Sequence, residues 1–298
     1  KPKTYAMKCS YVDYLLASEK TKKHVGKATI FISHTWQYDF WKLVSCISSN
    51  AGKGNITNTY IWLDIFSINQ HGNALENFDF QWWTGTFQAA IREIHHTLIV
   101  FSPWHQPAVL QRAWCLWEIY STIITNSRME IAIHGNEESQ FIDDVLKAGG
   151  DSLKMLLTTL NYIDSEKSRC YDPLDEQRIH KAIQDSLGFK KINKLVSNVL
   201  KERVQQIMEE KVRYNSLSST QQIQVKDILN TFSSRTPDLV SNVLLLPNSL
   251  TSLHGSADSL LRQGKFDRAE AALLNALERD EREFGPDHPV TLSTMQQL

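Results

Sequence analysis

Three polar loops rich in aromatic residues contain the side chains best suited to chemistry. They span residues 33–39, 67–73 and 102–111, and each follows a short apolar segment. The helix expected after the third loop contains Trp114 and Glu118, which are four residues apart and therefore share one helical face. We expect this pair to lie beside the loops, where a carboxylate and an aromatic ring could contact one ligand.

The elements that must position these loops are strands and helices in alternation. Apolar, β-rich runs predict four strands, at residues 28–32, 60–65, 98–101 and 129–133. Between them, apolar residues recur at helical spacing, as they do over residues 111–125. This alternation predicts an α/β fold with a parallel sheet covered by helices on both faces. Ligands bind such sheets beyond the carboxyl ends of the strands, where the three loops would meet.

The second half of the chain has a different pattern. We interpret residues 160–163 as a fifth strand, and residues 137–147 and 175–208 as helical. All eight tryptophans lie between residues 36 and 117. This asymmetry indicates separate domains, and we expect three regions. These are a sheet domain over residues 1–165, an α-helical extension over 166–250 and a repeat region over 251–298.

Composition excludes several classes of protein. The 32 Lys and Arg residues are balanced by 33 Asp and Glu residues, so the basic excess expected of a nucleic-acid-binding protein is missing. No apolar run approaches the ~18 residues of a membrane span. The four cysteines lack CxxC spacing, which favours reduced thiols and a cytoplasmic protein. The adjacent pair His95 and His96 would diverge around a helix, so we expect no metal site and no bound cofactor.

The C-terminal residues resemble a tetratricopeptide repeat of the kinesin-light-chain type. The similarity covers residues 255–298 and includes Gly264 in a predicted turn, small residues at Ala269 and Ala276, and Pro289 at the repeat boundary. The resemblance implies the start of a repeat array, with an antiparallel helix pair at residues 254–263 and 267–282. Such an array would bind a protein or peptide partner.

Residues 26–165 resemble a Toll/interleukin-1 receptor (TIR) domain. The resemblance rests on a strand ending in Ile-Ser, a strand ending in Asp64, the Ile-Val-Phe-Ser strand and the sequence Trp-Cys-Leu-Trp-Glu-Ile at residues 114–119. The last motif is closest to the plant form of the domain. The resemblance implies a flavodoxin-like fold, self-association through this domain and a role in signalling or immunity. It also implies hydrolysis of NAD⁺, here a substrate, often with cyclisation of the ADP-ribose product.

The resemblance also implies roles for individual residues. Glu118 takes the place of the catalytic glutamate, and Trp114 the place of an aromatic residue near the nicotinamide. The loop after the first strand would contact the nucleotide, and the loop after the second strand corresponds to the family's BB loop. The substrate-binding candidates are therefore Trp114, His34, Thr35, Trp36, Asp64, Ser67, Asn69 and Gln70. Asp64 has a second interpretation, as a residue that only caps a turn.

Glycosidic chemistry suits a single carboxylate. Cleavage of the nicotinamide–ribose bond passes through an oxocarbenium-like state, which Glu118 could stabilise, and neutral nicotinamide leaves without a general acid. The loop at residues 33–39 has no arginine for the pyrophosphate, and backbone N–H groups at the start of the helix at residues 40–50 could substitute; how the pyrophosphate is held stays open. Two alternatives stay open. One is a non-enzymatic scaffold, and the other is an enzyme similar to the nucleoside deoxyribosyltransferases.

Overall fold

The computed structural model describes residues 2–51, 59–71, 80–146 and 151–214, and single positions after them. Contacts divide the chain into two compact units, residues 1–235 and 236–298. In the second unit, the positions described between 270 and 278 are helical, and the side chain of Leu273 is buried. The rest of the helix pair predicted at 254–263 and 267–282 lies outside the described residues.

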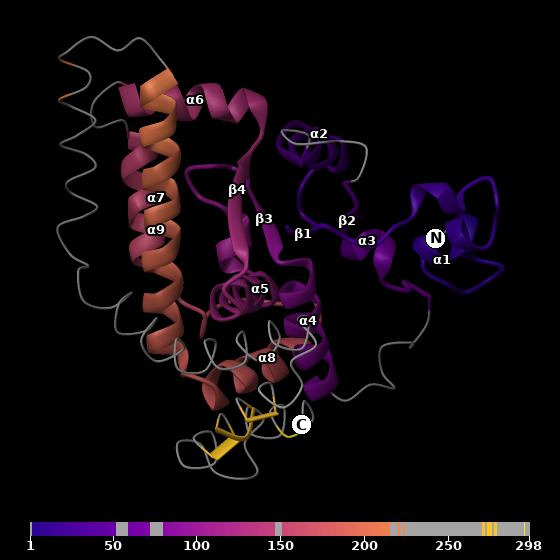
Figure 1. The fold of residues 1–298 in the computed structure, drawn as a ribbon. Coiled ribbons are helices and arrows are strands. Elements are labelled where there is room, and N and C mark those ends of the chain that lie inside the picture. The colour runs from indigo at the N-terminus through magenta and orange to yellow at the C-terminus, as the bar shows by residue number, and fades with distance from the viewer. Residues whose placement is uncertain are drawn as a thin grey trace. The chain divides into compact units, whose positions relative to one another are not determined.

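The first unit is built on a four-stranded sheet in which every pair of neighbouring strands is parallel (Figure 1). The strands lie in the order β2-β1-β3-β4. Their bounds are Ile30–Ser33 for β1, Ile61–Trp62 for β2, His96–Phe101 for β3 and Arg128–Ile133 for β4. The predicted strands and their parallel pairing are confirmed, and the strand order is consistent with a flavodoxin-like α/β fold.

Side chains alternate between the two faces of the sheet, and helices cover both faces. On β1, Ile30 and Ile32 pack with Leu43 and Cys46 of α2 (Phe40–Ala51), whereas Phe31 packs on the opposite face with Phe87 of α4 (Phe80–Ile94). The helix α5 (Ala113–Ile124) contacts α4, β1, β3 and β4. The segment that follows β1 therefore has α2 on one side and α5 on the other.

Two predicted strand segments are helical instead. Asp64 begins the short helix α3 (Asp64–Ser67), so β2 is shorter than expected, and an acidic residue in a first turn stabilises a helix. The fifth strand predicted at residues 160–163 is wrong. Leu153, Leu156 and Leu160 recur at helical spacing and are buried along one face of α7 (Asp151–Asn161). The apolar residues read as a strand are the end of that stripe and the turn after it.

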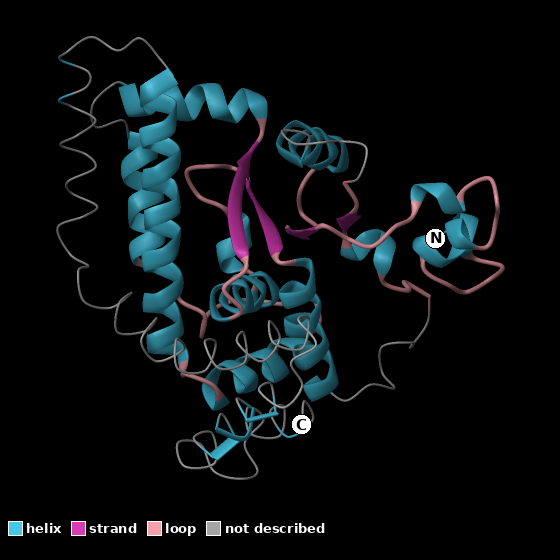
Figure 2. Cartoon of the chain, in the orientation of Figure 1, coloured by secondary structure: helices cyan, strands magenta, loops and turns pink. Residues whose placement is uncertain are grey.

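Further helices surround the β4 side of the sheet (Figure 2). They are α6 (Gly135–Leu146), α8 (Pro173–Asp185) and the 26-residue α9 (Phe189–Tyr214). The predicted helices over 137–147 and 175–208 are thus confirmed. The helix α8 begins with Pro173 after the capping residue Asp172, which accepts a hydrogen bond from the Leu174 N–H. Helix α9 contacts β4, α5, α6, α7 and α8.

A small N-terminal segment packs near α3. It contains α1 (Tyr11–Leu16), whose first turn is closed by a capping box between Ser10 and Asp13. Tyr11 contacts the ring of Phe66 in α3. Among the described helices, none has the length and apolar character needed to cross a membrane.

Candidate active site

The carboxyl end of β1 carries three polar residues that are almost wholly buried, Ser33, His34 and Thr35. Ser33 is two residues after Phe31 in β1, so its side chain lies on the same face of the sheet as Phe31. This is the face that α4 and α5 cover. The backbone carbonyl of His34 accepts a hydrogen bond from Cys115 Sγ of α5 at 3.1 Å. The end of β1 is therefore fixed against the first turns of α5.

Glu118 lies one turn further along α5, and its side chain is buried against this strand end. The residue is 9% exposed. Burial disfavours the charged carboxylate and raises the pKa of Glu118 to about 8, an effect that the Ser33 hydroxyl partly opposes and the negative charge of Asp64 reinforces. At neutral pH the protonated form of Glu118 is therefore favoured.

Three buried polar atoms around this position make no hydrogen bond: Ser33 Oγ, His34 Nε2 and Glu118 Oε2. Buried polar groups are nearly always hydrogen-bonded, because leaving one unpaired costs about 1–3 kcal/mol. Burial also lowers the pKa of His34 against the opposing effect of Asp64, so its imidazole is neutral. A cluster of unpaired donors and acceptors at a strand end is the arrangement expected of a site that pairs them with a ligand.

Asp64 connects this cluster to the segment after β2. Its Oδ2 accepts a hydrogen bond from Trp36 Nε1 at 2.6 Å, and its Oδ1 accepts one from the Ile65 N–H at 2.7 Å. Asp64 Oδ1 also lies 3.6 Å from His34 Nε2. The loops after β1 and β2, which are far apart in the sequence, therefore converge at Asp64 and approach Glu118 together.

The other predicted residues lie at varying positions around this group. Thr35 is buried, and its hydroxyl accepts a hydrogen bond from the Gln37 N–H. Ser67 is the last residue of α3. The side-chain amide of Asn69 donates to the Lys8 carbonyl, while that of Gln70 donates to the Asp64 carbonyl at 3.5 Å. Asn69 thus binds the N-terminal segment, and Gln70 supports the backbone of Asp64.

Trp114 packs in an apolar cluster. It lies against Phe31, Phe87 and Ile91, with ring centroids 5.4 Å from Phe87. A hydrogen bond from Trp114 also helps to lower the pKa of Asp175, which burial raises. The structure thus joins Glu118, His34, Trp36 and Asp64 through direct contacts or charge, and it places Trp114 among apolar and α8 neighbours.

The expected pyrophosphate position at the start of α2 is occupied by a side chain of the protein itself. Asp39 precedes this helix, and its Oδ1 accepts a hydrogen bond from the Lys42 N–H at 2.9 Å. This carboxylate accepts from one of the backbone donors that were considered for phosphate binding, the Lys42 N–H. The side chain of Asp39 therefore caps this helix N-terminus in part.

Sequence reasoning missed two members of the site, Ser33 and Cys115. Ser33 could have been found, because it is the last residue of a buried strand, and Cys115 precedes Glu118 by almost one turn. Burial raises the pKa of the Cys115 thiol, with a further contribution from Glu118, so this cysteine is a poor nucleophile. It acts instead as a donor to the His34 carbonyl.

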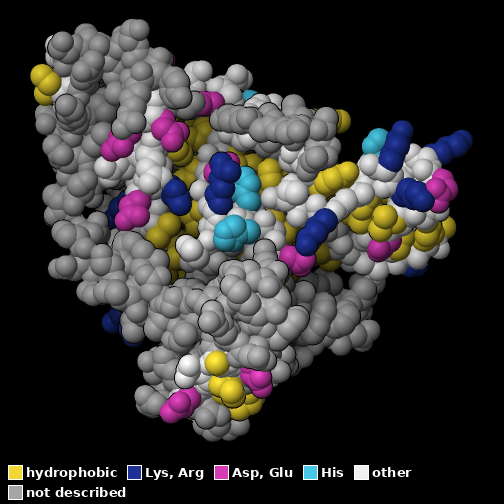
Figure 3. All heavy atoms as spheres, in the orientation of Figure 1, with side chains coloured by type: hydrophobic (Ala, Val, Ile, Leu, Met, Phe, Trp, Pro, Cys, Tyr) yellow, Lys and Arg dark blue, Asp and Glu magenta, His cyan; other side chains and the backbone are white. Residues whose placement is uncertain are grey.

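A separate charged group lies at the amino ends of β3 and β4. Glu130 Oε2 is 3.3 Å from His96 Nε2, and Glu130 also pairs with Arg128. These neighbours, His96 first, lower the pKa of Glu130. Figure 3 shows Lys, Arg and His side chains gathered near the middle of the face it draws. Within the part of the chain that the structure describes, no group of three or more His, Cys, Asp or Glu residues is arranged to bind a metal ion.

Comparison with known proteins identifies the C-terminal region. Residues 248–298 match the tetratricopeptide repeat family, which confirms the repeat predicted there. Repeats of this kind stack into extended surfaces that commonly bind other proteins. No curated protein and no solved structure matches the chain.

Proposed function

We propose that the sheet domain cleaves the nicotinamide–ribose bond of NAD⁺, with Glu118 as the catalytic carboxylate. The observation that carries this proposal is the buried Glu118 with its unpaired Oε2, close to the Ser33 hydroxyl and to the charge of Asp64, whose carboxylate lies 3.6 Å from His34 Nε2. The parallel sheet and the TIR-like motifs at residues 26–165 support the choice of substrate. The site lies where open α/β sheets bind ligands, beyond the carboxyl ends of the strands.

The charge of the substrate complements the protonation state of this site. The nicotinamide ring of NAD⁺ is positively charged, so its arrival beside Glu118 lowers the raised pKa, and the Glu118 proton passes to solvent, which leaves the carboxylate. The C–N bond then breaks with both electrons moving to nicotinamide, which leaves as a neutral molecule. The carboxylate stabilises the oxocarbenium-like ribose, in surroundings where exclusion of water strengthens its field.

Neutral His34 and Ser33 would bind the ribose hydroxyls. Water completes the reaction by adding to the ribose carbon and releasing a proton, which gives ADP-ribose; attack by the adenine ring would give a cyclic product. Because Glu118 is buried, the substrate requires the loop at residues 33–39 to open, and the Trp36–Asp64 hydrogen bond is the contact that opening would break.

The test is nicotinamide release from NAD⁺ by the full chain and by Glu118→Gln, which keeps the shape and removes the charge. We expect kcat to fall by at least ~10²-fold, the scale of losing one electrostatic stabiliser. Glu202→Gln in α9 is the matched control, because burial also raises the pKa of that glutamate while it lies away from the strand end. An active parent with an equally active Glu118→Gln variant would rule out the assignment.

A non-enzymatic scaffold is the second candidate, and exposed aromatic residues favour it. Trp36 is 59% exposed and Trp41 75% exposed, which is unusual for side chains that gain most from burial. In that case these residues mediate self-association and the repeats bind a peptide, in a cytoplasmic signalling complex. A parent that releases no nicotinamide at any protein concentration, yet assembles through Trp41, supports the scaffold. Analysis of products separates NAD⁺ hydrolysis from transfer of deoxyribose.

A further inference from the structure

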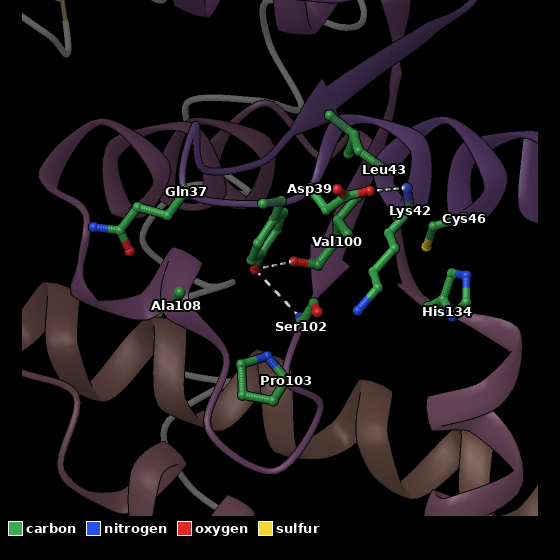
Figure 4. A pocket seen from close by; sticks show the side chains of 11 residues that line it. Gln37, Asp39, Lys42, Leu43, Cys46, Val100, Ser102, Pro103, Ala108 and His134 are labelled. Carbon is green, nitrogen blue, oxygen red and sulfur yellow. Dashed lines mark hydrogen bonds between the residues drawn. The ribbon is translucent and has the colours of Figure 1, made fainter.

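A cavity of about 280 Å³ lies on the α2 side of the sheet, away from Glu118. It is lined by the segment after β1, the first turns of α2, the end of β3 and the residue after β4 (Figure 4). In the order β2-β1-β3-β4, β1 connects to β2 on one side and β3 connects to β4 on the other, so the strand order reverses between the parallel strands β1 and β3. Open α/β sheets bind ligands at this point.

The wall of the cavity is fixed by Tyr38. Its hydroxyl donates a hydrogen bond to the Val100 carbonyl at 2.9 Å and accepts one from the Ser102 N–H at 3.2 Å (Figure 4). Leu43 and Cys46 of α2 are buried and add an apolar surface. The cavity is therefore preformed by hydrogen bonds between the loop after β1 and the end of β3.

Two basic side chains face this space. Figure 4 shows the Lys42 amine extending between Ser102 and His134, whose ring lies at the end of β4. In the described part of the chain, neither side chain has a hydrogen bond or an ion pair. Lys42 is exposed to solvent. Because α2 lies over the sheet here, the lysine side chain is nevertheless directed at the cavity.

The carboxylates nearby are already engaged by other donors. Asp39 Oδ1 accepts from the Lys42 N–H, and the two oxygens of Glu137 accept from Ser102 Oγ at 2.8 Å and the Trp104 N–H at 2.9 Å. These contacts hold both carboxylates to the backbone or to Ser102. Asp39 also lines the cavity, and the lysine amine and the imidazole are the basic lining groups, which bring hydrogen-bond donors without a partner in the described part of the chain.

We propose that this cavity binds a small organic phosphate of about the size of a phosphorylated pentose. Lys42 and His134 would bind the phosphate oxygens, and Tyr38, Leu43 and Val100 would contact the sugar ring. The volume of about 280 Å³ lies at the lower end of the range for small-molecule sites, which fits a sugar phosphate better than a whole dinucleotide. The site is separate from Glu118 and does not depend on the reaction proposed there.

Calorimetry with ribose 5-phosphate tests this site, using the full chain. We expect saturable binding that weakens by about tenfold or more in Lys42→Gln and in His134→Gln. Lys181→Gln, a charge-matched change on α8, should bind as the parent does. Ala108→Met fills the cavity without changing charge and should abolish binding.

Two further probes identify which part of the ligand is recognised. Ribose without phosphate should not bind, and inorganic phosphate should bind more weakly than ribose 5-phosphate, with the same loss in Lys42→Gln. Absence of ribose 5-phosphate binding would overturn the proposal, and so would equal affinity in the parent, Lys42→Gln and Ala108→Met. Because binding is read directly, these results do not depend on whether Glu118 is catalytic.

Discussion

The two sides of the loop after β1 differ in how they treat charge. On the α5 side, Glu118 is buried with an unpaired oxygen, and the protein keeps it protonated at neutral pH. On the α2 side, Lys42 reaches solvent beside a preformed cavity, and the neighbouring carboxylates are held by other donors. One short loop thus separates a buried carboxyl group from an open cavity that a lysine and a histidine line together with Asp39.

This difference shows that the burial of a side chain, more than its type, determines the charge that each side presents to a ligand. The closed side gains a charge only when a cation arrives, because the surroundings do not solvate a carboxylate. The open side presents the Lys42 amine to solvent, where the proposed phosphate would bind. The two proposed sites therefore suit different ligands, a cation on the α5 side and an anion on the α2 side. Each site can be changed by mutation without changing the other.

The largest expected effect concerns the pH dependence of stability on the α5 side. The pKa of Glu118 is about 8 in the folded chain and near 4.5 when unfolded, so between these values only the folded state holds the proton. The contribution of Glu118 to the free energy of unfolding should then fall as pH rises from 5 to 8, by roughly 1.4 kcal/mol for each unit of pKa difference, while the lowered pKa of His34 contributes in the opposite sense. Glu118→Gln should lack this decline, and Glu210→Gln on the exposed side of α9 should keep it.

Tryptophan fluorescence during urea unfolding measures this difference. All eight tryptophans lie between residues 36 and 117, so the signal reports on the sheet domain. Parallel curves for the parent and Glu118→Gln across this pH window would show that Glu118 is not protonated in the folded state.

An intermediate effect is expected on the α2 side, from Tyr38→Phe. Loss of the hydroxyl leaves the Val100 carbonyl and the Ser102 N–H without their partner, which should lower the free energy of unfolding by about 1–3 kcal/mol. Tyr162→Phe is the control, because Tyr162 is 79% exposed, and it should change stability by less than about 0.5 kcal/mol. Equal stability of the two variants would mean that Tyr38 does not fix the cavity wall.

The smallest effect should come from Asp64→Asn, which tests whether the second loop influences Glu118. Removing the negative charge lowers the pKa of Glu118, so the pH-dependent decline in stability should end at a lower pH. We expect a shift below one unit, worth about 1 kcal/mol or less, because burial is the larger cause. The matched change Asp143→Asn, at an exposed residue of α6, should leave the pH at which this decline ends unchanged. A shift to higher pH would contradict the proximity of Asp64 to Glu118.

Much of the fold could be predicted from local sequence. Buried parallel strands are continuous apolar runs, so residues 28–32 and 98–101 were recognisable without tertiary information. The segment at 160–163 was misread because a four-residue apolar run does not distinguish a strand from the last turn of a helix. The decisive pattern lay upstream, in the spacing of Leu153, Leu156 and Leu160.

The candidate site was predictable only in part. The meeting of the loop after β1 with Asp64 after β2 followed from the parallel topology, because the carboxyl ends of the strands share one edge. The other two predicted loops make contacts elsewhere, with the N-terminal segment and around the cavity on the α2 side. The direction that each side chain takes could not be predicted from the topology, because it depends on how the side chains pack. Trp114 shares a helical face with Glu118 in sequence, yet Phe87 of α4 contacts its ring. The cap on α2 was missed because Asp39 was counted only as part of a polar loop.

The contacts of α9 determine where this chain can be divided. Ile192, Val196, Leu200 and Val204 recur at helical spacing along α9 and are buried, and the helix contacts α5, which carries Glu118. A truncation near residue 165 would remove α8 and α9 and expose the surfaces that they cover on α5, α7 and β4. Domain dissection for expression or crystallisation should therefore keep the chain through Tyr214, so that the helix bearing Glu118 retains its neighbours.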